Sequence, residues 1–167
     1  DIRIDTISLS RHHYIDKINN DILGFKSISA NQIKEYNEQL PGLIHLSCNL
    51  IKGYIDTRER AYTYLEKASK IGANSVGFVS LMPINQYCKD NFVDFRSMNL
   101  LSKRFNQTRE LRYKDMCVCH NYFYIPKNMG PLVHVYTKNT YRPFDMTTSL
   151  VFDGQNLKLG YGNEIIF

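Results

Sequence analysis

Three short apolar segments, each typical of a β-strand, alternate with two segments of helical periodicity in the first half of this sequence. The strand-like segments cover residues 2–9, 43–51 and 75–82, and the helix-like segments cover residues 29–40 and 57–71. Strands joined through helices by short connections almost always run parallel, with right-handed crossovers. We therefore expect an α/β fold whose strands end at one shared rim, where such folds place their binding sites.

Local signals mark the ends of the helical segments. Residues 29–32 have the spacing of a capping box, with Ser followed three residues later by Gln. The second helical segment starts at another such pair, Asp56 with Glu59, for which Thr57 is a competing cap. Gly72 is expected just beyond the end of that helix.

The sequence starts with a strand-like segment and has no initiating Met. A parallel sheet of so few strands has exposed edges and little to cover them. We therefore expect this chain to be the later part of a larger α/β protein, cut at or before a strand. Chemistry carried by the preceding part would then be absent from these residues.

The second half of the sequence has a different composition. Residues 84–115 contain seven Lys or Arg and four Asp or Glu, and are interpreted as a basic helical connector. From residue 116 the pattern is strand-like, with strands expected at 122–125, 132–137 and 149–152 and a hairpin turn at 153–156. The expected organisation is thus an α/β part at residues 1–83, a connector at residues 84–115 and a β-rich extension at residues 116–167.

Composition excludes few classes of protein. The sequence is 43% hydrophobic and 22% charged, as in ordinary globular proteins. It has no run of roughly 18 apolar residues that would cross a membrane, and no visible signal peptide. Its four cysteines are irregularly spaced, so a disulfide framework is not expected and a reducing cytoplasm is the default location.

Specific residues in the first half carry a resemblance to a known family. Residues 43–53, LIHLSCNLIKG, are similar to the fifth strand of the family's barrel and the turn after it. Residues 57–76 are similar to the helix, glycine and strand that follow in that family. Residues 78–83, FVSLMP, are similar to a sixth strand, and residues 4–9 would be the fourth. On these residues the chain resembles the radical S-adenosylmethionine (radical SAM) enzymes, nearest to the branch around molybdenum cofactor biosynthesis protein A.

The resemblance implies a fragment of a partial (β/α)6 TIM-like barrel, strands four to six, followed by the small β-rich extension. It also implies two cofactors, S-adenosylmethionine and a [4Fe–4S] cluster, whose reductive chemistry gives a 5′-deoxyadenosyl radical that abstracts hydrogen from a small-molecule substrate. The C-x3-C-x2-C motif that binds the cluster is missing from this sequence, as is the family's glycine-rich cofactor motif. The chain is therefore expected to be inactive alone, without catalytic residues, and to partner the missing N-terminal part of the same polypeptide.

The resemblance and the expected rim select two groups of candidate site residues. The S-adenosylmethionine pocket is expected to use Ser8, Ser10 and Asn49, together with backbone at Leu81, Met82 and Pro83. The substrate is expected to contact His12, His13, Lys52 and Asn85. The alternative for each is a surface or packing role. Adjacent side chains on a strand point to opposite faces, so His12 and His13 are not expected to share a metal ion.

Cysteines in the second half suggest a metal site. Cys88, Cys117 and Cys119, with an open position or His120 as fourth ligand, would suit an additional iron–sulfur cluster or zinc. Against this, the C-x-C spacing is a poor match to the usual C-x2-C. The alternative is three cysteines without a metal.

A second functional class remains open. The net charge is +5, and five of the connector's seven Lys or Arg are interleaved with Phe105 and Tyr113. These cations are Lys103, Arg104, Arg109, Arg112 and Lys114. They could bind a nucleotide or RNA in a non-enzymatic α/β module, although a solvated surface is the favoured interpretation because Glu110 and Asp115 lie among them.

Overall fold

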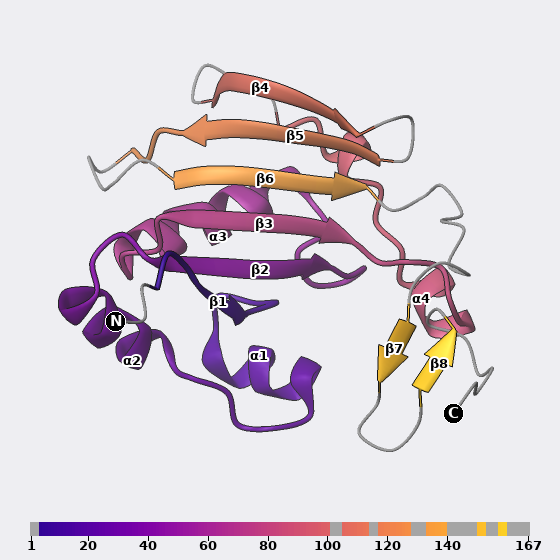
Figure 1. Ribbon diagram of the computed structural model, residues 1–167, viewed down its shortest axis with the longest axis horizontal. Helices are drawn as coiled ribbons and strands as arrows, with labels where there is room; N and C mark the ends of the chain where they lie inside the picture. Colours follow the sequence, from indigo (N-terminus) through magenta and orange to yellow (C-terminus); the bar gives the residue numbers. More distant parts are fainter. Residues whose placement is uncertain are drawn as a thin grey trace.

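The computed structural model describes residues 4–100, 105–113, 117–127, 133–139, 150–152 and 157–159. Its elements, in chain order, are β1 (Ile7–Ser10), α1 (Asp16–Leu23), α2 (Ala30–Gln39), β2 (Ile44–Leu50), α3 (Arg58–Lys70), β3 (Ser75–Ser80), α4 (Gln86–Asp90), the 3-10 helix η1 (Phe95–Met98), β4 (Phe105–Tyr113), β5 (Cys117–Tyr124), β6 (Val133–Asn139), β7 (Leu150–Phe152) and β8 (Leu157–Leu159). The expected α/β class is confirmed (Figure 1).

Six of these strands form one open sheet in the order β1-β2-β3-β6-β5-β4. The first three strands lie side by side in chain order and run parallel, and β6 adds to β3 in the same direction. Strands β5 and β4 then continue the sheet in antiparallel fashion. Strands from the expected β-rich extension are therefore hydrogen-bonded into the same sheet as the strands of the first half.

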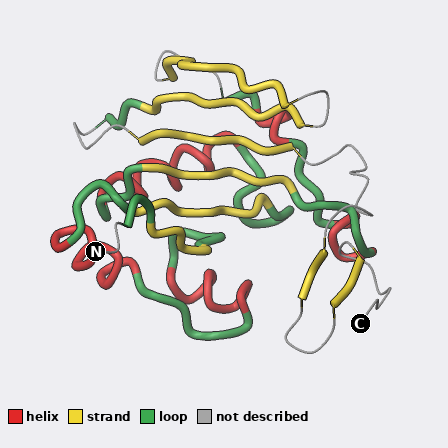
Figure 2. The backbone as a smooth tube through the Cα atoms, viewed as in Figure 1, coloured by secondary structure: helices red, strands yellow, loops and turns green. Residues whose placement is uncertain are grey.

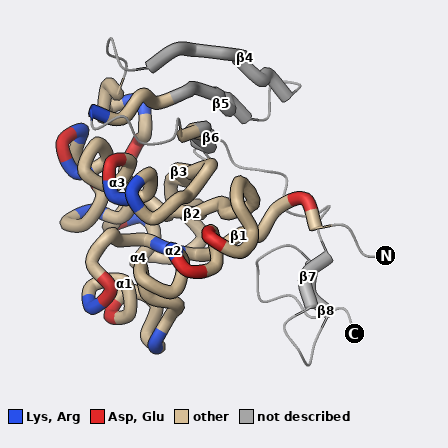
Figure 3. The backbone as a smooth tube through the Cα atoms, turned by 90° about the vertical axis from the view of Figure 1, so that its left-hand side faces the viewer, with Lys and Arg blue, Asp and Glu red and all other residues tan. Residues whose placement is uncertain are grey.

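Helices α1, α2 and α3 lie to one side of this sheet, as the side-on view in Figure 3 shows. The six strands of the sheet form one layer in Figure 2, where the separate β7–β8 pair is also drawn in yellow. The core lies between α3 and the sheet. Tyr64 of α3 is 1% exposed and its ring contacts that of Phe78 on β3, with 5.6 Å between centroids. Phe78 also stacks on Phe95 of η1.

The apolar sequence of residues 43–51, with little alternation, favours a strand covered on both faces, but burial alternates along β2, as in a strand with one covered face. Ile44, Leu46, Cys48 and Leu50 are fully buried, while the residues between them are half-buried. The buried set faces the helices, because it shares the core with α3. The opposite face of the sheet therefore carries the intervening, mostly polar residues.

Predicted helix boundaries are largely confirmed. Ser29 accepts a hydrogen bond from the Gln32 backbone N–H and the Gln32 side chain accepts from the Ser29 N–H, which completes the expected capping box. Gly72 follows α3 with a φ of 83°, a conformation that glycine adopts without strain. The proposed Asp56–Glu59 box is wrong, because Thr57 is the cap of α3 and accepts from Arg60 N–H.

The interpretation of residues 84–115 as a helical connector is wrong in its second half. Helix α4 and η1 occupy part of residues 84–100, but residues 105–113 form β4 and pair with β5 across a register shift between Gln107 and Arg109. The expected hairpin near the end of the chain has its two strands, β7 and β8, paired antiparallel. Its turn, residues 153–156, lies outside the described residues.

Among the helices that the structure describes, none has the length and apolar character needed to cross a membrane.

Candidate functional site

A polar surface covers the side of β1 and β2 that faces away from the helices. The parallel register places Ser8 beside His45 and Ser10 beside Ser47, and Asn49 follows two residues later on β2. Because neighbouring strands point register partners to the same face, these five residues share one surface, which we call the polar sheet face. Sequence alone could not decide whether Ser47 and Asn49 or Cys48 would lie on this side.

Several groups on the polar sheet face have unused hydrogen-bonding capacity. The side chains of Ser8, Ser10, Ser47 and Asn49 make no hydrogen bond to any residue for which side chains are described. His45 differs, since its Nδ1 lies 2.7 Å from Ser75 Oγ on β3. The surface thus offers hydroxyl and amide groups to a ligand near the carboxyl ends of β1 and β2.

His12 lies at this rim but is turned into the protein. Its Nδ1 accepts a hydrogen bond from the Asn49 backbone N–H at 3.1 Å, which joins the end of β1 to the end of β2. The neutral ring therefore carries its proton on Nε2. Burial lowers the pKa of His12, so the ring is held in the neutral form that this hydrogen bond needs.

His13 is buried on the other side of the turn. Its Nδ1 accepts from the Ile15 N–H at 3.1 Å, and its ring stacks on Tyr14 with 4.3 Å between centroids. Burial lowers the pKa of His13, and the positive charges of Arg11 and Arg60 act in the same direction. One nitrogen of each histidine is thus engaged by backbone, which leaves Nε2 as the atom that could meet a substrate.

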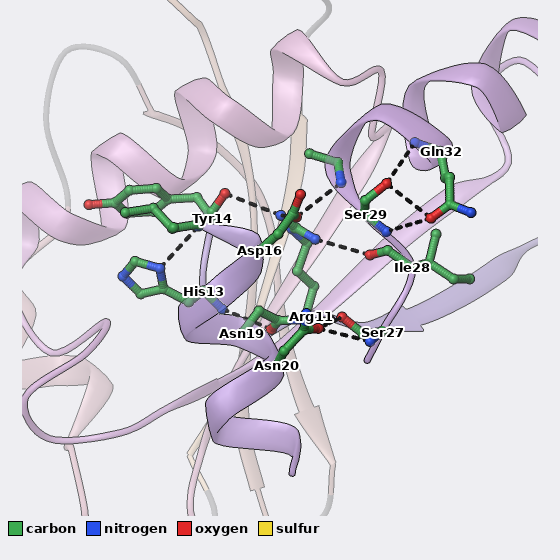
Figure 4. A network of polar contacts seen from close by, with 12 residues as sticks. Arg11, His13, Tyr14, Asp16, Asn19, Asn20, Ser27, Ile28, Ser29 and Gln32 are labelled. Atoms are coloured by element: carbon green, nitrogen blue, oxygen red, sulfur yellow. Dashed lines mark hydrogen bonds and ion pairs between the residues drawn. The ribbon is translucent and has the colours of Figure 1, made fainter. Parts of the chain in front are cut away.

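A network of buried polar groups holds this turn in place (Figure 4). Asn19 of α1 is 0% exposed, and its Oδ1 accepts from the backbone N–H groups of both His12 and His13. Its Nδ2 donates to Ser27 Oγ. Since buried backbone N–H groups need partners, Asn19 fixes the path of the chain after β1.

Arg11 ties the same turn to α1 and α2. Its guanidinium group is 3% exposed and contacts Asp16 Oδ1 at 2.5 Å, and it also donates to the carbonyl oxygens of Tyr14 and Ile28. Asp16 Oδ1 accepts in addition from the Ala30 N–H at the start of α2. Arg11 and Asp16 thereby set the positions of both helices relative to the rim.

The other expected contacts lie around the ends of β2 and β3. Lys52 is exposed just beyond β2, and Leu81, Met82 and Pro83 follow β3 directly. Asn85 is the N-cap of α4, and its Oδ1 accepts from the Cys88 N–H at 2.8 Å. That oxygen is therefore committed to the helix, and its amide nitrogen is the group left for a substrate.

The expected metal ligands lie on separate elements. Cys88 is on α4, whereas Cys117 and Cys119 are on β5, where the structure describes the backbone. Within the described part of the chain, no group of three or more His, Cys, Asp or Glu could hold a metal ion. Cys48 is a packing residue, since burial raises the pKa of its thiol and its Sγ lies 3.7 Å from the His12 carbonyl oxygen.

The basic residues of the expected connector have a different setting from the one predicted. Arg109 and Arg112 lie on β4, the outer strand of the sheet, while Lys103, Arg104 and Lys114 lie outside the described residues. Binding of a nucleotide or RNA there stays a prediction. A steep loss of RNA affinity with added salt would support it, and absence of RNA binding would contradict it.

Lowering the pH below 6.5 should destabilise the fold. The pKa values of His12 and His13 lie below their usual 6.5 in the folded chain. At pH values between 6.5 and these lowered pKa values, the unfolded chain therefore binds more protons than the folded chain. Stability is therefore full above pH 6.5 and falls as the pH drops towards the folded-state pKa values. Urea unfolding at pH 7.5 and 5.5 should show a lower midpoint at pH 5.5, and a His12→Gln/His13→Gln variant should show a smaller difference. If the urea midpoint of that variant falls between pH 7.5 and 5.5 by as much as that of the unaltered chain, the pH dependence comes from other titratable groups.

Comparison with known proteins gives no relative: no family model, no curated protein and no solved structure matches this chain.

Proposed function

We propose that this chain is the C-terminal part of a radical SAM enzyme, in which β1, β2 and β3 are strands four to six of a partial (β/α)6 barrel. In this proposal the polar sheet face is the inner surface of the barrel. The chain contributes part of the S-adenosylmethionine pocket and a lid over a small-molecule substrate, and the cytoplasm is its place of action.

The polar sheet face is the observation that carries the proposal. In a (β/α) barrel the helices lie outside, and the ligand meets side chains at the carboxyl ends of the strands and in the loops that follow them. Here α3 packs on the side of Leu46 and Phe78. Ser8, Ser10 and Asn49 lie on the opposite side, the polar sheet face. Among the described residues, helices cover one face of the parallel strands β1 to β3, which suits a barrel wall better than a doubly covered open sheet, whose strands are apolar on both faces.

The outer edge of β1 supports the same proposal. Strand β1 pairs with β2 on one side, and no other described strand pairs with it. Backbone groups of Ser8 and Ser10 are available there, because Ile7 and Arg11 donate their N–H groups to β2. A preceding strand from the missing N-terminal part of the polypeptide would complete this edge.

The residues present fit one of the two implied cofactors. Hydroxyl and amide groups of Ser8, Ser10 and Asn49 suit the ribose and amino-acid ends of S-adenosylmethionine, and backbone at residues 81–83 would meet its adenine. The [4Fe–4S] cluster does not fit, because three closely spaced thiolates are needed and the cysteines are at positions 48, 88, 117 and 119. We assign the cluster to the preceding part of the polypeptide and derive no reaction step through it.

Strands β4, β5 and β6 have a defined place in this proposal. They carry the sheet past β3, so the inner surface extends beyond the three barrel strands. The remainder of the β-rich extension then serves as the substrate lid. His12 and His13 are buried at the turn after β1 with Nδ1 bound by backbone N–H groups, so the substrate contact expected of them would fall to Nε2.

Titration of the isotopically labelled chain with S-adenosylmethionine tests the proposal. Amide chemical shifts should move at Ser8, Ser10, Asn49 and residues 81–83. Asn49→Ala should weaken binding about tenfold, as expected for loss of one buried polar contact. Asn74→Ala is the matched control, because Asn74 is exposed before the start of β3, at the opposite end of the sheet.

Two results would contradict the proposal. Shifts confined to other surfaces, or equal weakening by Asn49→Ala and Asn74→Ala, would remove the pocket from the polar sheet face. Cleavage of S-adenosylmethionine by this chain alone, assayed anaerobically with a strong reductant, would refute the assignment as an incomplete catalyst.

A further inference from the structure

A second hollow lies on the opposite, helix-covered side of the sheet. It is a cavity of about 230 Å³ between β2, the start of α2 and the last turns of α3. Its lining includes Arg11, Leu46, Lys67, Ala68, Lys70 and Ile71. Because Leu46 points towards the helices, this cavity is separated by the sheet from the polar sheet face.

The charged side chains that line the cavity are all basic. Arg11, Lys67 and Lys70 line it, and no Asp or Glu does. The nearby carboxylate of Asp16 is bound to Arg11. Lys67 and Lys70 form no ion pair with any residue whose side chain is described. They lie three residues apart on α3 and are therefore neighbours on the helix surface, where like charges repel each other.

The interior of the cavity is apolar. Leu46 and Ala68 lie beneath its floor, at 0% and 2% exposed, and the partly exposed Ile71 packs against the same core. The Tyr64 hydroxyl is already donated to the Arg11 carbonyl oxygen at 2.6 Å, so Tyr64 presents its ring to the cavity. An apolar floor with positively charged groups at its mouth is the arrangement that suits an organic anion.

We propose that this cavity binds a small organic anion, with a carboxylate or phosphate head between Lys67 and Lys70. Its compact apolar body lies against the partly exposed Tyr14, Ala30 and Ile71. Arg11 closes the inner end, where its guanidinium group is paired with Asp16 and bound to two carbonyl oxygens, so Lys67 and Lys70 carry the uncompensated positive charge. The site is independent of S-adenosylmethionine, since it lies on the other side of β2. A ligand there would tie α3 to the turn after β1 and so to the rim.

Four probe compounds separate the parts of this proposal. Benzoate and phenyl phosphate carry an anionic head on an aromatic body, benzyl alcohol has the body alone, and inorganic phosphate has the head alone. Titrations of the labelled full chain should shift the amides of Ala68 and Ile71 with one or both of the first two compounds. The anion that binds more tightly, benzoate or phenyl phosphate, identifies the head group. Benzyl alcohol and inorganic phosphate should each bind at least tenfold more weakly than that anion.

Charge variants supply the matched control. Lys67→Gln/Lys70→Gln should weaken binding about tenfold, because two exposed charge contacts of modest strength are removed. Lys17→Gln/Lys34→Gln removes the same net charge from exposed positions on α1 and α2 outside the cavity, and should leave binding within twofold. Urea unfolding of each variant checks that the fold is retained.

The proposal is overturned by any of three results. The first is that neither benzoate nor phenyl phosphate at about 10 mM shifts the amide signals of Ala68 or Ile71. The second is that benzyl alcohol or inorganic phosphate binds as tightly as the better of these two anions. The third is that the two double variants weaken binding equally. None of these results depends on S-adenosylmethionine binding, so the two proposals can fail separately.

Discussion

Phe78→Ala should lower the free energy of unfolding by about 3–5 kcal/mol, the usual cost of removing a buried aromatic side chain. Phe78 is 0% exposed at the centre of β3, with Tyr64 of α3 at 5.6 Å and Phe95 of η1 at 6.5 Å between ring centroids. The substitution removes the contact that joins these three elements and leaves a cavity that the rigid sheet cannot fill. Since domains of this size are stable by roughly 5–15 kcal/mol, a large share of the stability should disappear.

Phe25→Ala is the matched control for this prediction. Phe25 is the same residue type, but it is 63% exposed in the loop between α1 and α2. Its loss should change the free energy of unfolding by less than about 0.5 kcal/mol. Urea unfolding followed by circular dichroism measures both variants, and equal losses would show that Phe78 is not part of the core described above.

The order of elements between residues 29 and 82 could be predicted because its signals are local. The capping box at Ser29 depends on two residues three positions apart. The position of Gly72 depends on the positive φ of that one residue. The start of α3 was more difficult, since Asp56 and Thr57 are both good caps. Asp56 is used elsewhere: its two carboxylate oxygens accept from the Gly53 N–H and from Arg60, which leaves Thr57 as the cap.

Strand β4 could not be predicted in the same way. Residues 105–113 contain the polar run from Gln107 to Glu110, which lacks the alternation of a half-buried strand. Pairing with β5 along most of its length determines its conformation, and that contact is made by residues later in the chain. Strand propensity depends on such neighbours more than on the segment itself.

The placement of the candidate residues at the strand ends could be predicted in outline, while their role in binding stays a prediction. The strand–helix order predicted a shared rim after β1, β2 and β3, and it selected Ser8, Ser10 and Asn49. It did not select His45, Ser47 or Asn19, because a shift of one residue exchanges the two faces of a strand. The role of Asn19 depends on a turn that brings α1 against residues 12–13, and no spacing rule describes that contact.

Asn19→Ala should destabilise the fold by about 3 kcal/mol and disturb the rim. Asn19 Oδ1 is the acceptor for the His12 N–H at 2.6 Å and the His13 N–H at 3.2 Å, and the residue is 0% exposed. Removing it leaves two buried N–H groups without their partner, each at a cost of roughly 1–3 kcal/mol. Because His12 also accepts from the Asn49 N–H, the amide signals of His12, His13 and Asn49 should move together in a nuclear magnetic resonance spectrum.

Ser27→Ala separates this effect from a general loss of polar contacts in the network. Ser27 accepts from Asn19 Nδ2, and its own hydroxyl and N–H donate to Asn20 Oδ1. The variant leaves both N–H groups of residues 12 and 13 bound to Asn19, so it should cost about 1 kcal/mol and leave the Asn49 signal in place. A loss as large as that of Asn19→Ala would mean that the α1–α2 loop, and not the two backbone N–H groups, sets the position of the rim. The comparison therefore tests whether one buried amide on α1 fixes the carboxyl end of β1 against β2.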